Sequence, residues 1–300
     1  MWIILALVSA ASLAVVHLTD KRLLDSHLPN LSTLYLWIAF GLAVYIVGAL
    51  AIFGIPTDTS FAYVAAAIGS GLALGVGFAL LFVGLKIGEA SRAVAIAQSY
   101  PIFVALLAVP LLGERLSAIQ WSAILLVVLG TMVISLPPST RRWSDLKPSK
   151  GTPALLGCGV FLGVGFFAAK LALQESSFPT VFIYQQLGTL IAFLPFCRPA
   201  VCRQLLGAMK NREAVGLLVV GEGLLPLVVV AGSLQATNLG PVSLVTAFLA
   251  TTPLFVFVLA TLLSQGRLHL MEEVISRQAL LVKLASITMI VLGVSALGFF

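Results

Sequence analysis

The sequence has 300 residues, of which 60% are hydrophobic and 9% are charged. Soluble domains carry about 25% charged residues, so the composition excludes an ordinary water-soluble protein. The formal net charge is +6. Because no basic, aromatic-interleaved surface lies outside the apolar stretches, nucleic acid is not an expected partner.

Apolar runs of about 20 residues recur along the whole chain, and each could cross about 30 Å of hydrocarbon as a helix. In lipid, only helices and closed barrels satisfy every backbone N–H and C=O group. The runs therefore predict an all-α integral membrane protein with ten transmembrane helices. Their expected bounds are residues 1–24, 32–53, 61–85, 93–112, 118–136, 153–173, 180–196, 214–236, 242–263 and 279–299.

Two stretches of the chain resemble one another at a spacing of 152 residues. When residues 88–116 are placed on residues 240–268 without a gap, 11 of 29 positions are identical. Apolar bias alone does not explain matched Gly, Ser, Pro and Arg in one register, so a duplication is expected. The matched pairs include Gly88 with Gly240, Pro101 with Pro253, and Arg115 with Arg267.

The duplication predicts two repeats of five spans each. The first repeat covers residues 1–136, a basic linker covers residues 137–152, and the second repeat covers residues 153–300. Because five is an odd number, the second repeat enters the membrane from the opposite side. In some membrane carriers, inverted repeats of this kind support alternating access to a site near the membrane midplane.

The positive charges predict an orientation in the membrane. Fifteen of the 17 lysines and arginines fall in or beside the odd-numbered connections between the expected spans. Positive residues concentrate in short loops on the cytoplasmic side. The charge count therefore predicts a multi-pass protein of the cytoplasmic (inner or plasma) membrane, with both termini outside.

The first of the matched stretches resembles a known family. The residues that carry the resemblance are Gly88, Ser91, Pro101, Gly113, Glu114, Arg115 and Leu116, followed by Gln120, Trp121 and Gly130, and in the second half Gly240, Pro241, Ser243, Pro253 and Gly293. Together they resemble the EamA repeat of the drug/metabolite transporter superfamily. The second half departs from the pattern, because Gly266 stands where the first half has Glu114.

The resemblance implies a ten-helix, duplicated carrier of small metabolites, often an exporter of amino acids or related solutes. It also implies that the first four helices of each half surround a central cavity and that the fifth helices pack outside. Members of the family are usually described with both termini in the cytoplasm, which is opposite to the charge count. Since the family includes proton-coupled and uncoupled members, the resemblance does not imply a coupling ion.

Glu222 is the clearest candidate for a functional side chain. An ionisable residue inside a span costs about 2.5–3.5 kcal/mol on insertion scales, which makes it a functional hypothesis by default. Glu222 lies in the middle of the eighth expected span, between Gly221 and Gly223. We expect it to couple transport to protons or to recognise a substrate amine; the alternative is a protonated group hydrogen-bonded to a neighbouring helix.

Three basic residues near span ends are further candidates. Lys21 and Lys170 occupy related positions in the two repeats. Each either extends to the membrane interface or faces a cavity and attracts a carboxylate or phosphate. His17 shares a helix face with Asp20 and Lys21, and it is either structural or a proton relay.

Polar residues precede a proline in two expected spans. Proline removes a backbone donor and frees a carbonyl one turn earlier. Nearby polar side chains therefore either line a cavity or hold helices together. The candidates are Gln98 and Tyr100 before Pro101, Thr252 before Pro253, and Tyr184 and Gln185 in the seventh expected span.

Glu114 and Arg115 flank the turn after the fourth expected span. A local ion pair or a cap on a helix end is the expected role of these two residues. The three cysteines lack metal-ligand spacing, so neither a metal nor another cofactor is expected.

The sequence favours a secondary carrier that exports small polar or amphipathic, amino-acid-like metabolites by alternating access, with or without proton coupling. The alternatives are a flippase of a lipid-linked substrate and a membrane scaffold subunit that transports nothing. An enzyme is not expected, because no HExxH, Gly-x-Ser-x-Gly or paired intramembrane aspartate motif is present. The expected partners are a small-molecule solute, the bilayer and, in the coupled case, protons. A monomer is expected to suffice, with an oligomer left open.

Overall fold

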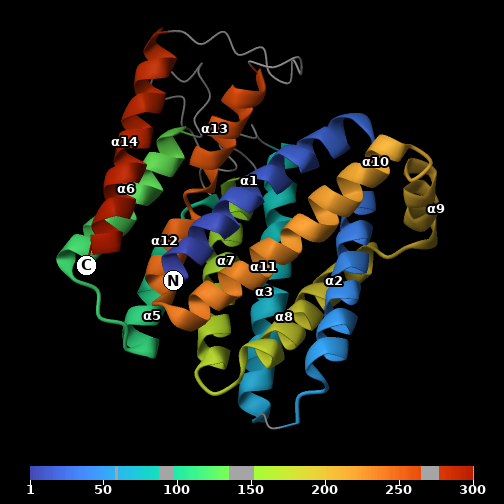
Figure 1. Ribbon diagram of the computed structural model, residues 1–300, viewed down its shortest axis with the longest axis horizontal. Helices are drawn as coiled ribbons and strands as arrows, with labels where there is room; N and C mark the ends of the chain where they lie inside the picture. Colours follow the sequence, from blue (N-terminus) through green and yellow to red (C-terminus); the bar gives the residue numbers. More distant parts are fainter. Residues whose placement is uncertain (58–59, 88–96, 135–151, 265–276, 300) are drawn as a thin grey trace. The chain divides into compact units, whose positions relative to one another are not determined.

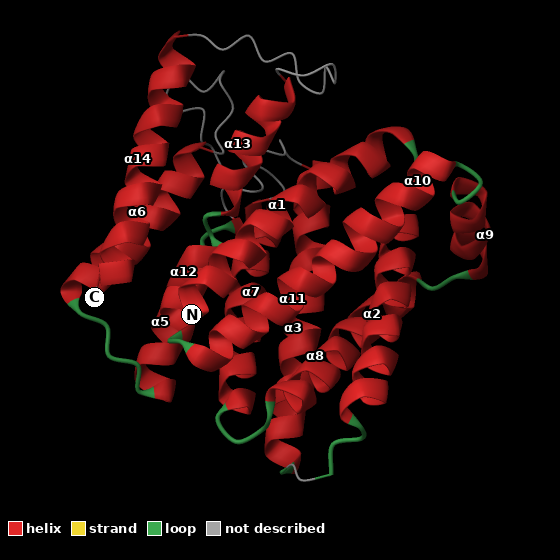
Figure 2. Cartoon of the chain, viewed as in Figure 1, coloured by secondary structure: helices red, strands yellow, loops and turns green. Residues whose placement is uncertain are grey.

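The computed structural model describes residues 1–57, 60–87, 97–134, 152–264 and 277–299. Every element within these ranges is helical (Figure 2). Among these residues, six helices are long and apolar enough to cross a membrane, or seven if one sharply bent pair counts as a single span. The expected all-helical membrane fold is confirmed, whereas the total of ten spans stays a prediction.

The chain forms two compact units, each built from two separated segments (Figure 1). The first unit contains Met1–Val76 and Gly165–Leu239, and the second contains Gly77–Val164 and Gly240–Phe300. Each unit therefore combines a part of the first half of the sequence with a part of the second half. The boundaries of the two sequence repeats stay a prediction, and the linker expected at 137–152 lies, except for Thr152, outside the described residues.

The first unit is a bundle in which α1 packs along α11 and α2 packs along α8. Helices α3 and α7 each contribute only a part to it. Its elements are α1 (Trp2–Ser26), α2 (Leu31–Phe53), α3 (Phe61–Ile87), α7 (Thr152–Leu173), α8 (Phe178–Phe193), η2 (Leu194–Phe196), α9 (Pro199–Ala208), α10 (Arg212–Gly216), η3 (Leu217–Leu224) and α11 (Leu225–Leu239).

The ends of α2 show how local sequence sets the helix bounds. The Asn30 side chain accepts a hydrogen bond from the Thr33 backbone N–H at 3.1 Å, which satisfies one of the free donors at the helix start. At the other end, Gly54 adopts φ 79°, a conformation that glycine reaches without a steric penalty. The expected span at 32–53 is thus delimited by a capping residue and a glycine.

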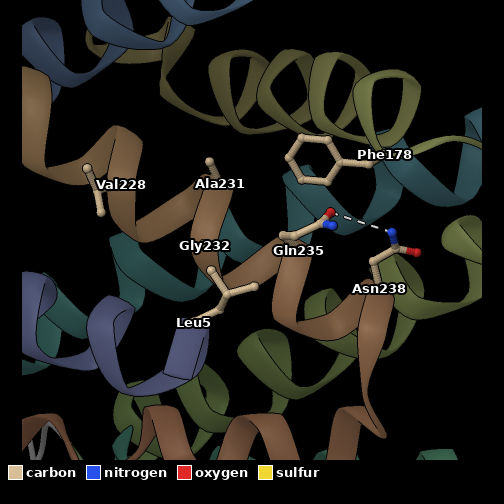
Figure 3. A pocket seen from close by; sticks show the side chains of 7 residues that line it. All are labelled: Leu5, Phe178, Val228, Ala231, Gly232, Gln235 and Asn238. Carbon is tan, nitrogen blue, oxygen red and sulfur yellow. Dashed lines mark hydrogen bonds between the residues drawn. The ribbon is translucent and has the colours of Figure 1, made fainter. Parts of the chain in front are cut away.

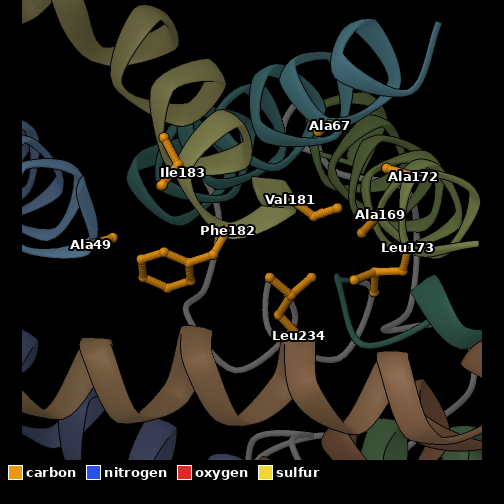
Figure 4. Close-up of a cluster of buried hydrophobic side chains, with 9 residues drawn as sticks. All are labelled: Ala49, Ala67, Ala169, Ala172, Leu173, Val181, Phe182, Ile183 and Leu234. Atoms are coloured by element: carbon orange, nitrogen blue, oxygen red, sulfur yellow. The ribbon is translucent and has the colours of Figure 1, made fainter. Parts of the chain in front are cut away.

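Small residues let the helices of the first unit approach closely. A Cβ atom added to Gly71 would lie 1.9 Å from the Gln185 backbone oxygen, and one added to Gly188 would lie 2.1 Å from that of Ile68. Helices α3 and α8 therefore touch through their backbones, as small-residue spacing favours in lipid. A cluster of mostly small and β-branched side chains from α2, α3, α7, α8 and α11 fills the adjoining core (Figure 4).

The seventh expected span ends at Phe196, as predicted, and a further helix follows it. Helix α8 stops at Phe193, a short 3₁₀ turn containing Pro195 follows, and α9 then leaves at an angle of 98°. Proline cannot donate a backbone hydrogen bond, so it favours a helix end at this point. Helix α9 carries two buried side chains, Val201 and Leu205, and was not expected from the sequence.

The second unit contains the remaining parts of α3 and α7. Within it α6 packs along α14, and α5 packs along α12. Gly130 of α6 and Gly293 of α14 each sit where an added Cβ would lie less than 3.0 Å from the opposite helix. Its other elements are α5 (Tyr100–Leu112), α6 (Ala118–Ile134), α12 (Val242–Leu249), α13 (Thr252–Ser264) and α14 (Arg277–Phe299).

Candidate functional site

The ninth expected span is not a continuous helix. Helix α12 ends at Leu249, Ala250 and Thr251 form a turn, and α13 begins at Thr252. We call this turn the second break. The span expected at 242–263 is found, since Val242–Leu259 is long and apolar enough to cross a membrane. It contains this turn because Pro253 favours the first turn of a new helix over a helix interior.

An equivalent turn lies in the first half of the chain. Gln98 and Ser99 form a turn directly before α5 begins at Tyr100, and we call it the first break. It divides the expected fourth span, of which residues 93–96 lie outside the described residues. Pro101 again stands in the first turn of the helix that follows.

The two breaks share one register. Helices α5 and α13 each have 13 residues, and both of their bounds differ by the same 152 residues that relate the sequence repeats. The Ile102 N–H donates to the Ser99 oxygen at 3.1 Å, and the Leu254 N–H donates to the Thr251 oxygen at 2.9 Å. The interruption is therefore a common feature of both halves.

At the second break, side chains replace the missing backbone bonds. Pro253 has no N–H to donate to the Leu249 carbonyl, and the Thr252 hydroxyl donates to that oxygen instead at 2.8 Å. The Thr251 hydroxyl donates to the Phe248 carbonyl at 2.7 Å. Both threonines are buried, so the end of α12 is closed by its own neighbours.

At the first break, a buried acceptor remains open. The Gln98 side chain is 9% exposed, and its Oε1 atom accepts no hydrogen bond from any described residue. Tyr100 is also buried. Because an unpaired buried polar atom costs about 1–3 kcal/mol, Gln98 Oε1 is suited to a donor group on a bound molecule.

Glu114 caps α12 from a distance. Its Oε1 atom accepts a hydrogen bond from the Val242 N–H at 2.6 Å, and its Oε2 atom accepts from the Ser243 N–H at 3.3 Å and from the Ser243 hydroxyl at 2.5 Å. Carboxylates stabilise helix N-termini because the first backbone N–H groups have no partner within the helix. Glu114 thus caps a helix 128 residues further along the chain, while Arg115 is exposed. Gly240 lies two residues before this helix start, and Gly88 lies outside the described residues.

Glu222 lies in the first unit, within the π-helical segment η3. Only 4% of Glu222 is exposed. Wider π-helical turns disrupt the usual backbone ladder and are frequent at functional sites. Two side chains of α2 bond carbonyls of this segment: Trp37 Nε1 donates to the Leu218 oxygen at 2.9 Å, and the Tyr45 hydroxyl donates to the Gly223 oxygen.

The Asp20 carboxyl group of α1 lies beside the Glu222 carboxyl group. The sequence placed Asp20 only near a span end, so this contact was not expected. The His17 Nδ1 atom lies 3.8 Å from Asp20 Oδ2. The backbone of Lys21 belongs to α1, and its side chain lies outside the described residues.

The other predicted polar residues bond other parts of the first unit. Lys170 Nζ donates to the Thr237 carbonyl at 2.8 Å and to the Asn238 carbonyl at 3.5 Å, in the last turn of α11. Gln185 Nε2 donates to the Ser70 hydroxyl at 2.8 Å. Tyr184 packs against the cluster shown in Figure 4.

An open cavity of about 560 Å³ lies in the first unit between α1, α8 and α11 (Figure 3). Its lining is apolar except for two amide side chains, Gln235 and Asn238, which hydrogen-bond one another at 3.5 Å. The remaining lining residues are Leu5, Phe178, Val228, Ala231 and Gly232.

Comparison with known proteins finds a family match over the first part of the chain. Residues 1–136 match the model of the EamA-like transporter family. The match places this part of the chain in the drug/metabolite transporter superfamily. Since this family consists of transporters, the match implies a multi-pass membrane protein in contact with a small-molecule solute and the lipid bilayer.

Solved structures share the fold of this chain, with 29 matching chains. A crystal structure of one protein aligns over 97% of this chain and 95% of its own, with a TM-score of 0.66 and 18% sequence identity. At this identity the likeness concerns the fold alone. No curated protein matches the sequence.

Proposed function

We propose that this chain is a secondary carrier that exports small polar or amphipathic, amino-acid-like metabolites by alternating access. The observation that carries the proposal is the pair of helix breaks in one register, at Gln98–Ser99 and Ala250–Thr251. In inverted-repeat carriers, interrupted helices present polar groups to the solute near the membrane midplane.

Proton coupling belongs to the same proposal. An acidic side chain within a membrane helix is costly to insert and marks ion or proton pathways in pumps and transporters. Glu222 fits this description, because it is buried inside a span and lies in a π-helical segment.

The function is tested by metabolite analysis of the medium and the cytoplasm of cells that overexpress the chain. With the natural sequence, one small solute is expected to rise outside and to fall inside. Glu222→Gln is expected to abolish the change at equal membrane abundance. Glu213→Gln is the matched control, because Glu213 is an exposed carboxylate nine residues earlier in the sequence.

A flippase of a lipid-linked substrate is the second candidate, and the cavity in Figure 3 favours it. The apolar lining suits a hydrocarbon chain, and Gln235 with Asn238 provides polar groups for a head group. If no soluble metabolite moves in the first experiment, the export proposal fails. Translocation of lipid-linked sugars in vesicles that contain the purified chain is then the deciding measurement.

A further inference from the structure

Two carboxyl groups meet inside the first unit, one from α1 and one from η3. The Asp20 side chain is 14% exposed and Glu222 is 4% exposed. Asp20 Oδ1 and Glu222 Oε1 are fully buried, and neither accepts a hydrogen bond from a donor among the described residues. The two carboxyl groups lie within hydrogen-bonding reach of each other.

Backbone packing brings the two acids together. A Cβ atom added to Gly221 would lie 2.1 Å from Thr19 Cγ2, so α1 and η3 touch at the residues that directly precede Asp20 and Glu222. Any larger residue at Gly221 would separate the elements. The contact between the carboxyl groups thus follows from a glycine placed beside one of them.

A hydrogen bond between two carboxyl groups requires a proton on one of them, because an ionised carboxylate only accepts. Two ionised carboxylates within hydrogen-bonding reach of each other would repel strongly in a buried setting. A metal cation fits less well, because Na⁺-sized and larger ions take several oxygen ligands. The Leu218 and Gly223 carbonyls already accept bonds from α2, and the described residues contain no group of three metal-ligating acids, histidines or cysteines.

We propose that Asp20 and Glu222 form a proton-binding site that holds one proton between their carboxyl groups. Release of this proton to water leaves both groups ionised, and uptake restores the hydrogen bond. The role of the site as the coupling site rests on the proposed transport function, whereas proton binding itself does not.

The surroundings provide one route for exchange with solvent. On α2, the titratable group that faces Glu222 is Tyr45, whose hydroxyl donates a hydrogen bond to the Gly223 carbonyl. On α1, His17 lies 3.8 Å from Asp20 and is 36% exposed, so it connects the pair to the outside. The Oε1 atom of Glu213 in α10 lies 3.0 Å from the Arg22 guanidinium and 3.4 Å from His27 Nε2.

The test is infrared difference spectroscopy of the purified full chain in lipid nanodiscs during a pH titration, without any solute. The C=O stretching band of protonated carboxyl groups is expected to disappear at high pH with an amplitude of one proton per chain. Asp20→Asn and Glu222→Gln are each expected to remove this component, and Glu213→Gln is expected to keep it. Addition of NaCl at constant pH is expected to leave the titration unchanged.

The outcomes separate this proposal from the transport proposal. A wild-type protein without a titrating protonated-carboxyl band overturns the site, even if neither variant folds. Identical titrations in wild type and both variants overturn it as well, and a shift with NaCl would replace the proton by an alkali cation. If the band behaves as expected and no solute is exported, the proton site stands and the export function falls.

Discussion

The first and second breaks share their register but differ in chemistry. At the second break, the carbonyls freed at the end of α12 are bonded by the Thr251 and Thr252 hydroxyls, and Glu114 caps the other end of the same helix. At the first break, Gln98 is buried and its Oε1 atom accepts no hydrogen bond from the described residues. The two breaks therefore share an interruption, but the second is closed by its own side chains and the first holds an acceptor with no donor among the described residues.

This difference indicates separate tasks for the two breaks. A helix end whose carbonyls all accept hydrogen bonds needs no donor from a bound molecule, so its role is to stabilise the fold. An unpaired buried amide is unfavourable alone and gains a bond when a donor arrives. We therefore expect substitutions near the second break to affect mainly stability, and substitution of Gln98 to affect mainly transport.

The largest effect is expected from Glu114→Ala. Loss of the three bonds to the start of α12 should lower the free energy of unfolding by about 1–2 kcal/mol. The measurement is denaturant unfolding of the purified protein in mixed micelles. Arg115→Ala is the control, since this exposed neighbour should change stability by less than about 0.5 kcal/mol. Equal unfolding midpoints for the two variants would contradict a stabilising role of the Glu114 cap.

Gln98→Met should reduce the export rate about tenfold, which corresponds to about 1.4 kcal/mol, without a loss of stability. The reason is that methionine keeps the length of the side chain and removes the Oε1 acceptor, which has no donor among the described residues. The export of the solute found by metabolite analysis and the unfolding midpoint are measured together. Gln185→Met is the contrasting variant, because it breaks the bond to Ser70 and should lower stability. A destabilised Gln98→Met protein would show that this amide is structural.

Thr252→Val should lower the free energy of unfolding by about 1 kcal/mol, because it leaves the Leu249 carbonyl without its donor. Thr288→Val provides the control, since the Thr288 hydroxyl bonds the Leu284 carbonyl within an uninterrupted helix. The same micelle unfolding assay compares them. No difference between the two would mean that the second break does not depend on its hydroxyl groups.

Hydrophobic pattern alone placed most helices to within a few residues. Helix α2 covers Leu31–Phe53 and α6 covers Ala118–Ile134, against expected spans at 32–53 and 118–136. Lipid is the reason, since each crossing needs a long apolar run with a fully bonded backbone. The pattern did not predict α9, because a ten-residue helix with several polar side chains carries no such run.

The candidate site was only partly predictable. Glu222 could be singled out because a charge within an apolar run is visible in the sequence, but its partner Asp20 is about 200 positions away. Glu114 was expected to cap a helix end, yet nothing local indicates that the helix begins at Val242. The breaks were marked by Pro101 and Pro253, which identify a weak point in a helix and not whether the helix actually stops.

The common length of α5 and α13 limits how the two halves of the gene can diverge. Each residue turns an α-helix by about 100°, so a single insertion between a break and the end of its helix would rotate every later side chain to a new face. Such a change would reverse which residues face neighbours and which face lipid. Substitutions can accumulate along these thirteen positions. Insertions and deletions are expected to be tolerated only in the connections that follow α5 and α13.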